Sequence, residues 1–429
     1  MIKKTEYKNI GETLYYGELA NGLRICVVPK PGFGSYYAIF GTNYGGAMRD
    51  FELEGEKIHT PAGVAHFLEH KMFDLPNGDN ALEMLSSNGA DPNAFTSSGV
   101  TMYYFKCTTG FEDNLKLLLH FVSTPYFTPE TVEKEQGIIG QEIQMGEDSP
   151  GSAIYYNLLS QLYSHHPIKD KVAGSIESIA EITDKTLYDC HKVFYSPSNM
   201  VLCVEGDVDP ERIFEIAEQE LDSQKMPIPH ADYGAAENLL PIEYRKEVEM
   251  PVSAPQFLIG AKLNNPDNIQ GRDQLKFRIT ATFTLKLLFG SSSKFYARLY
   301  SDGILNHDFD ADVDFSAGTS TLLIGGESLY PDKVLEEINK EIDRILHEGF
   351  DPGYFERSKR AAMGQHLRGY EDFDNVCVSL AMDMIDGFCS FDALDILKGI
   401  TQDECINWVR ENITSEKLAI SIISPIKDA

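Results

Sequence analysis

Short apolar runs alternate along this chain with longer segments of helical periodicity. Runs of apolar and β-branched residues bounded by turn residues predict strands, and Asn21-Gly22 between two such runs predicts a hairpin turn. Apolar residues spaced three and four apart predict amphipathic helices, one of which opens at Thr128-Pro129 and ends near Met145. Strands are expected at 17–28, 36–40, 101–107, 200–205, 256–263 and 418–423, and further helices at 80–88, 111–122, 184–194, 210–221, 272–289, 331–347 and 352–368.

This order of elements divides the chain into two α+β halves of about 200 residues each. The stretch 223–238 has no periodicity and predicts a linker. After it, strands and helices follow in a loosely similar order, which suggests an internal duplication. We therefore predict domains at 1–225 and 241–429, joined by a linker at 226–240.

Composition limits the classes of protein to consider. A hydrophobic content of 42% with 24% charged residues is typical of a globular protein, and no apolar run approaches the roughly 18 residues of a membrane span. The seven cysteines form no C-x-x-C pair and the N-terminus has no apolar signal segment, so we expect free thiols in the cytoplasm. The net charge of −29 disfavours nucleic acid as a partner and suits a basic peptide, although it is equally typical of simple solubility.

The stretch His66-Phe67-Leu68-Glu69-His70 is the candidate for chemistry. It has the form H-x-x-E-H, the inverse of the zinc-protease motif H-E-x-x-H. Thr60-Pro61 predicts the start of the helix that carries it. On a helix His66 and His70 lie on one face, so both can bind one metal ion, and Glu69 beside them can take a proton from a metal-bound water.

A catalytic zinc site usually has three protein ligands, so a third is needed. The helix that opens at Thr128 carries Glu135 and Glu142 seven residues apart, hence on one face. Glu142 lies between Ile139 and Ile143, on a side expected to pack inward, where a carboxylate requires a partner. The alternative is a solvent-exposed helix that is simply rich in acids.

Several motifs in order resemble the pitrilysin family of inverzincin metallopeptidases, which includes insulysin and the mitochondrial processing peptidases. The resemblance covers nearly all of 15–220, is that of a short, two-domain bacterial-type member, and fades in the second half. It is carried by 61–70, by Asn93-Ala94-Phe95-Thr96-Ser97, by 135–143, by 174–179 and by 195–208.

The resemblance implies a fold, a site and an activity. The fold would be α+β, with two homologous domains, each a mostly antiparallel sheet with helices packed on one face. One Zn²⁺ per chain would be bound by His66, His70 and Glu142, with Glu69 as general base and Glu135 beside the metal as support. Asn93, Ala94 and Phe95 would form a sheet edge that binds an extended peptide, although an ordinary turn-to-strand transition explains the same residues.

One departure from the family pattern concerns the second half. There many members contribute an arginine and a tyrosine to the substrate; here Arg298 matches a structural arginine, no basic residue occupies the catalytic position, and Phe309 replaces the tyrosine. We therefore expect a zinc endopeptidase for short or unfolded peptides. We expect it to act as a dimer, and the missing residues suggest a heterodimer in which a homologous subunit supplies Arg and Tyr. The alternatives are a non-catalytic peptide-binding or assembly subunit and a structural metal site, which the base Glu69 disfavours.

Overall fold

The computed structural model describes residues 1–429 except 54, 265–268 and 427–429. It contains two compact units. Unit 1 comprises Met1–Ile143, Lys171–Tyr233 and Leu367–Phe391, and unit 2 comprises Gln144–Asp170, Gly234–His366 and Asp392–Ala429. The units are thus not the two contiguous stretches that the sequence predicts, because one segment of each half belongs to the other unit.

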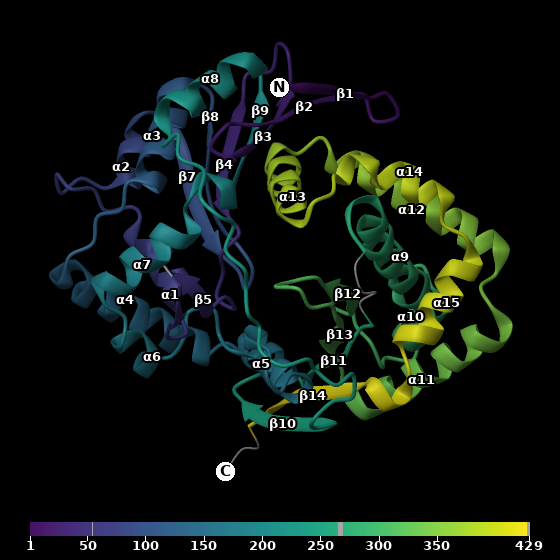
Figure 1. Ribbon diagram of the computed structural model, residues 1–429. Helices are drawn as coiled ribbons and strands as arrows, with labels where there is room; N and C mark the ends of the chain where they lie inside the picture. The colour runs from purple at the N-terminus through teal and green to yellow at the C-terminus, as the bar shows by residue number, and fades with distance from the viewer. Residues whose placement is uncertain (54, 265–268, 427–429) are drawn as a thin grey trace. The chain divides into compact units, whose positions relative to one another are not determined.

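The core of unit 1 is a seven-stranded sheet with the order β1-β2-β3-β9-β4-β8-β7 (Figure 1). All neighbouring pairs are antiparallel except β3 and β9, which run parallel with Cys26 opposite Cys203. The strands are β1 (Lys3–Tyr7), β2 (Glu12–Glu18), β3 (Arg24–Pro29), β4 (Tyr36–Thr42), β7 (Ala90–Thr96), β8 (Thr101–Cys107) and β9 (Met200–Gly206), and a separate hairpin pairs β5 (Asp50–Leu53) with β6 (Glu56–His59).

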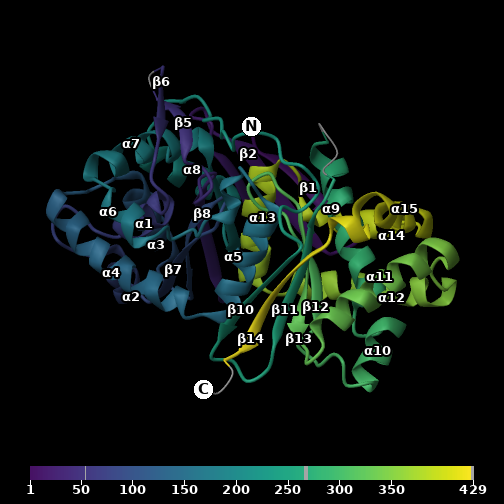
Figure 2. The ribbon, with the colours of Figure 1, turned by 90° about the horizontal axis from the view of Figure 1, so that it is seen from below.

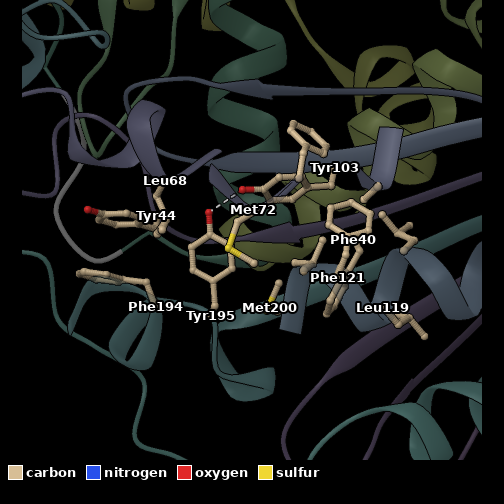
Figure 3. Packing of buried hydrophobic residues seen from close by; sticks show 14 of the residues in the cluster. Phe40, Tyr44, Leu68, Met72, Tyr103, Leu119, Phe121, Phe194, Tyr195 and Met200 are labelled. Carbon is tan, nitrogen blue, oxygen red and sulfur yellow. Dashed lines mark hydrogen bonds between the residues drawn. The ribbon is translucent and has the colours of Figure 1, made fainter. Parts of the chain in front are cut away.

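One face of this sheet carries the main hydrophobic core. Figure 3 shows its aromatic centre, where the hydroxyls of Tyr103 and Tyr195 are hydrogen bonded at 2.8 Å. Tyr44 stacks on Phe194 with 4.0 Å between ring centroids. The helices of this unit around that core are α1 (Val64–Lys71), α2 (Ala81–Ser87), α3 (Phe111–Ser123), α4 (Pro129–Glu147), α6 (Ile176–Ala180), α7 (Asp184–Phe194) and α8 (Pro210–Glu220).

The other face of the sheet is covered by a helix from late in the chain. α13 (Phe373–Asp386) packs on β4 and β9 and buries Cys377 and Leu380 against Cys26, Cys203 and their neighbours. Because successive strand residues point to opposite faces, the apolar residues of β3, β4 and β9 supply both cores. This packing is the physical reason that residues 367–391 belong to unit 1.

Unit 2 repeats this arrangement around a five-stranded sheet with the order β10-β14-β11-β13-β12 (Figure 2). Only β10 and β14 are parallel. α5 (Pro150–Leu162) packs on one face, where Leu158 leaves no room for a side chain at Gly260, and α9 and α11 contact β12 and β11. The elements are β10 (Arg245–Met250), β11 (Gln256–Lys262), β12 (Asp310–Asp314), β13 (Thr321–Glu327), β14 (Ala419–Pro425), α9 (Gly271–Phe289), α10 (Lys294–Ser301), α11 (Pro331–Glu348), α12 (Pro352–Gly369), α14 (Ala393–Gly399) and α15 (Gln402–Asn412).

The predicted fold class is confirmed: two α/β units, each built on a mostly antiparallel sheet. The prediction placed helices on one face of each sheet, and the structure also has a helix on the second face: α13 in unit 1 and α5 in unit 2. Asn21-Gly22 connects β2 to β3, as expected. In the described part of the chain no helix is long and apolar enough to cross a membrane.

The predicted start of the motif helix was wrong. α1 begins at Val64, and its N-cap is Gly63, which makes no side-chain cap. Gly63 has a φ of 100°, and a side chain there would lie 2.7 Å from the carbonyl oxygen of Ala173. Thr60 instead donates its hydroxyl to the carbonyl of Arg49. Glycine is thus required both for the backbone conformation and for the close approach.

Candidate metal centre

Helix α1 presents His66 and His70 side by side. Val64, Ala65, Phe67 and Leu68 bury one face of the helix in the core and so fix its orientation. The two imidazoles follow one another by one turn, with 4.7 Å between ring centroids, and their side chains are 19% and 22% exposed. Burial, with the neighbouring His70, lowers the pKa of His66 to about 4, so its imidazole is neutral at physiological pH.

Helix α4 places Glu142 next to His66 and His70. Its Oε2 lies 3.8 Å from Nε2 of His66 and 3.5 Å from Nε2 of His70. Zinc bonds of about 2.0–2.1 Å in a tetrahedron put ligand atoms roughly 3.4 Å apart, so this donor set fits zinc. It is the single group of three or more His, Cys, Asp or Glu residues with metal-ligand spacing in the part of the chain that the structure describes.

The expected burial of Glu142 was wrong. Its side chain is 44% exposed, whereas Ile139 and Ile143 are buried. At 100° per residue Glu142 lies 60° from Ile139 and 100° from Ile143, at the border of the buried stripe. The carboxylate is therefore open to solvent on one side and faces the two histidines on the other.

Glu135 hydrogen bonds to His70 through Nδ1, the ring nitrogen other than the one nearest Glu142. Nδ1 of His70 lies 3.1 Å from Oε1 of Glu135, and Nζ of the buried Lys71 lies 3.9 Å from Oε2. Burial alone would raise the pKa of Glu135, but the hydrogen bond to His70 and the neighbouring positive charges outweigh it and lower that pKa. A carboxylate that accepts from Nδ1–H leaves the lone pair of Nε2 free to bind a metal ion placed between His70, His66 and Glu142.

Glu69 is buried at the inner side of the site. The residue is 8% exposed, and burial raises the pKa of its carboxyl group against the opposing hydrogen bond from Thr96 and charge of His70. Oε2 accepts a hydrogen bond from the Thr96 hydroxyl at 2.5 Å. A raised pKa is typical of carboxylates that exchange protons during a reaction.

The edge strand β7 contains the predicted substrate-binding residues Asn93, Ala94 and Phe95. β7 pairs with β8 on one side and is the last strand of the sheet order, and α1 packs against it. Asn93 is exposed, and its side-chain oxygen accepts from the amide of Ala94 at 2.8 Å. Its NH₂ group lies within hydrogen-bonding reach of the hydroxyl of Tyr104, the opposite residue on β8, and carries a second N–H for a new acceptor.

The sequence does not predict a role for Thr96 at this site, although Thr96 belongs to the motif Asn93-Ala94-Phe95-Thr96-Ser97. Its contact with Glu69 joins residues 27 apart in the chain, and neither helical nor strand periodicity reports such a contact. The available signal was its place at the end of the strand that follows the metal motif.

The two residues of the second half that the sequence analysis singled out belong to unit 2. Arg298 forms an ion pair with Glu337 at 2.6 Å, in keeping with the structural role expected of it. Phe309, at the position predicted to replace a tyrosine, is buried against Phe257, Phe295 and Tyr296. It therefore serves packing within that unit.

Comparison with known proteins agrees with this fold and site. Residues 58–175 match the insulinase family (peptidase family M16), and 181–362 match the domain described as the M16 inactive domain. A Bacillus subtilis protein named as an uncharacterised zinc protease, YmfH, is 36% identical over 99% of this chain and all of its own length. The fold and the donor set thus define an M16-type zinc-protease architecture.

Solved structures have the same fold. An M16-like peptidase from Alicyclobacillus acidocaldarius superposes with a TM-score of 0.91 at 30% identity, covering 99% of each chain. A protease from Helicobacter pylori superposes with a TM-score of 0.81 at 19% identity, covering 96% of this chain and 99% of its own. This chain belongs to peptidase family M16, which confirms the resemblance found in the sequence.

Proposed function

We propose that the chain is a zinc-dependent endopeptidase acting on short or unfolded peptides, with one zinc ion bound by His66, His70 and Glu142. The observation that carries the proposal is the three donor atoms within 4.8 Å of one another beside the buried carboxylate of Glu69. The zinc-protease names of the relatives agree with this assignment. Three protein ligands leave one position for chemistry, whereas a structural site uses four.

Each residue then has a defined task. A zinc ion held by this donor set would lower the pKa of a water molecule and polarise the peptide carbonyl. Glu69 takes the proton of the attacking water and delivers it to the leaving amine. Glu135 keeps Nε2 of His70 directed at the site.

The peptide would bind as an added strand along the outer edge of β7. Ala94 and Phe95 supply backbone groups there, and the NH₂ of Asn93 donates to a peptide carbonyl. An extended backbone is required for this pairing, and a folded protein seldom offers one. Short or unfolded peptides are therefore the expected substrates.

The test is the variant Glu69→Gln, assayed with a mixture of peptides and for zinc content. The amide cannot accept the proton, so we expect cleavage to be abolished while zinc remains at one per chain. Unchanged cleavage, or loss of zinc in this variant, would contradict the role of Glu69. Glu133→Gln, at an exposed position of α4, is the matched control and should retain both.

We further propose that the active form is a dimer, in which a homologous partner supplies an arginine and a tyrosine. The buried Phe309 and the absence of a basic residue at the family's catalytic arginine position support this. The net charge of −29 favours a partner of lower negative charge over a second copy. Turnover by the purified chain alone equal to that of a co-expressed pair would refute the heterodimer.

The second candidate is a non-catalytic peptide-binding or assembly subunit. The match of 181–362 to a domain described as inactive favours it. Such a subunit would bind peptide on β7 with the same affinity in the wild type and in Glu69→Gln, and neither would cleave. Retention of all of His66, Glu69, His70 and Glu142 favours the peptidase. A cytoplasmic location remains a prediction.

A further inference from the structure

A threonine at the end of β7 contacts the carboxylate of Glu69. The Thr96 hydroxyl lies 2.5 Å from Oε2, which is the distance of a short hydrogen bond to a charged acceptor. Among the described residues no other group hydrogen bonds to this carboxylate. One oxygen of Glu69 is thus held, and Oε1 is left for another proton.

The hydroxyl protons in this region determine the direction of that bond. Thr101 lies opposite Thr96 in the β7–β8 pair and donates its own hydroxyl to the carbonyl of Tyr44 at 2.9 Å. The Thr96 and Thr101 hydroxyl oxygens are 3.3 Å apart, a longer contact. A threonine has one hydroxyl proton, and the Thr96 proton goes to the nearer, negatively charged carboxylate.

The backbone around Thr96 is fixed by the adjoining turn. Ser97 closes the β7–β8 loop with its amide on the carbonyl of Val100 at 2.8 Å, and the amide of Gly46 donates to Ser97 at 2.9 Å. A side chain at Gly45 would lie 2.5 Å from the Ser97 carbonyl oxygen, so this loop fits only against glycine. Thr96 therefore presents its hydroxyl from a rigid support.

We propose that Thr96 is a positioning residue for the general base: it holds Oε2 of Glu69 so that Oε1 faces the attacking water. The inference deepens the proposed peptidase function and rests on it. Since Thr96 ends the same strand that would pair with the peptide, the substrate-binding edge and the base share one rigid element. Among the described residues the Thr96 side chain hydrogen bonds to Glu69 and Thr101, and to none of the three metal donors.

Two substitutions at Thr96 separate the hydroxyl from the shape of the side chain. Thr96→Val removes the hydroxyl at nearly constant volume, and Thr96→Ser keeps it. Loss of a hydrogen bond to a charged group predicts a fall in kcat of roughly 10- to 100-fold for valine, with KM within about twofold and zinc at one per chain. Serine should retain most of kcat. Thr13→Val, on β2 of the same sheet, is the matched control.

Crystal structures of the wild type, Thr96→Val and Thr96→Ser give a readout other than activity. We expect the Glu69 carboxylate in one conformer with threonine or serine, and rotated or in several conformers with valine. If the valine variant unfolds at a lower temperature than Thr13→Val, Thr96→Ala replaces it in the same comparison.

The outcomes separate this inference from the function beneath it. An active wild type, with valine and serine variants of equal kcat or with an unchanged Glu69 conformer in the valine variant, would overturn the role of Thr96 alone. A wild type that binds zinc and peptide but cleaves nothing, with any related subunit present, would overturn the peptidase function and this inference with it.

Discussion

The two sheets of this protein have the same topology and different chemistry. In unit 1 the five strands β3, β9, β4, β8 and β7 are adjacent in that order, and in unit 2 β10, β14, β11, β13 and β12 follow with the same parallel and antiparallel pairs. The correspondence also holds along the chain, because each set occurs in the same sequence order. This supports the duplication that element order alone suggested.

The helices between equivalent strands differ in what they carry. α1, between β4 and β7, contains the metal motif, whereas α9 and α10, between β11 and β12, contain no histidine. α4 carries Glu135 and Glu142, and its counterpart α12 carries Glu356 on an exposed face. The comparison teaches that the repeated topology specifies a sheet and its helices, while a few side chains on two helices specify the metal site.

The sharpest way to break this comparison is to remove one carboxylate from each of the two equivalent helices. We expect Glu142→Gln on α4 to weaken zinc binding by more than the roughly 100-fold that marks loss of an outer partner, because it removes a donor atom. Glu356→Gln on α12 should change nothing. Zinc content and competition with a chelator measure both. Equal zinc affinity in the two variants would refute the assignment of Glu142.

Part of this site was predictable from the sequence because helical spacing alone places His66 and His70 on one face. Helix spacing offered Glu142 as a candidate third ligand but left open an ordinary acid-rich surface helix, and the family resemblance decided between them. The hydrogen bond from Thr96 to Glu69 was not predictable, because it depends on how β7 packs against α1. The exchange of α5 and α13 between the units was missed for a related reason: apolar periodicity predicts a buried face and does not specify which sheet buries it.

The assignment of α13 to unit 1 and of α5 to unit 2 gives a second test of the comparison. Leu380 on α13 and Leu158 on α5 are both buried, and Leu→Ala at either should cost about 2–5 kcal/mol of unfolding free energy. Hydrogen exchange locates the effect: Leu380→Ala should raise exchange in β4 and β9, and Leu158→Ala in β11 and β14. The exposed Leu329→Ala should stay within about 0.5 kcal/mol. If Leu380→Ala instead raised hydrogen exchange in β11 and β14, and Leu158→Ala in β4 and β9, the assignment of α13 to unit 1 and of α5 to unit 2 would be refuted.

The smallest expected effect concerns a buried ionisable residue that only one of the two equivalent strands β9 and β14 contains. β9 carries Glu205, which is fully buried, while the equivalent strand β14 buries alanine, isoleucine and serine residues. Burial raises the pKa of Glu205 to about 7, against the opposing effect of the Lys30 ammonium 3.2 Å away. The unfolded carboxyl has a pKa of 4.5, so the folded state binds the proton more tightly.

The sign of the pH dependence follows from this difference. The stabilising contribution of protonated Glu205 is complete below pH 4.5 and is lost as pH rises through 7, by about 3 kcal/mol in total. Glu205→Gln carries no such proton, so we expect it to equal the wild type near pH 4.5 and to exceed its unfolding free energy by up to about 3 kcal/mol at pH 8. Urea unfolding between these pH values measures the difference, with the exposed Glu18→Gln as control. If the unfolding free energies of the wild type and of Glu205→Gln changed in parallel with pH over this range, burying the carboxylate in β9 would not distinguish the two sheets energetically.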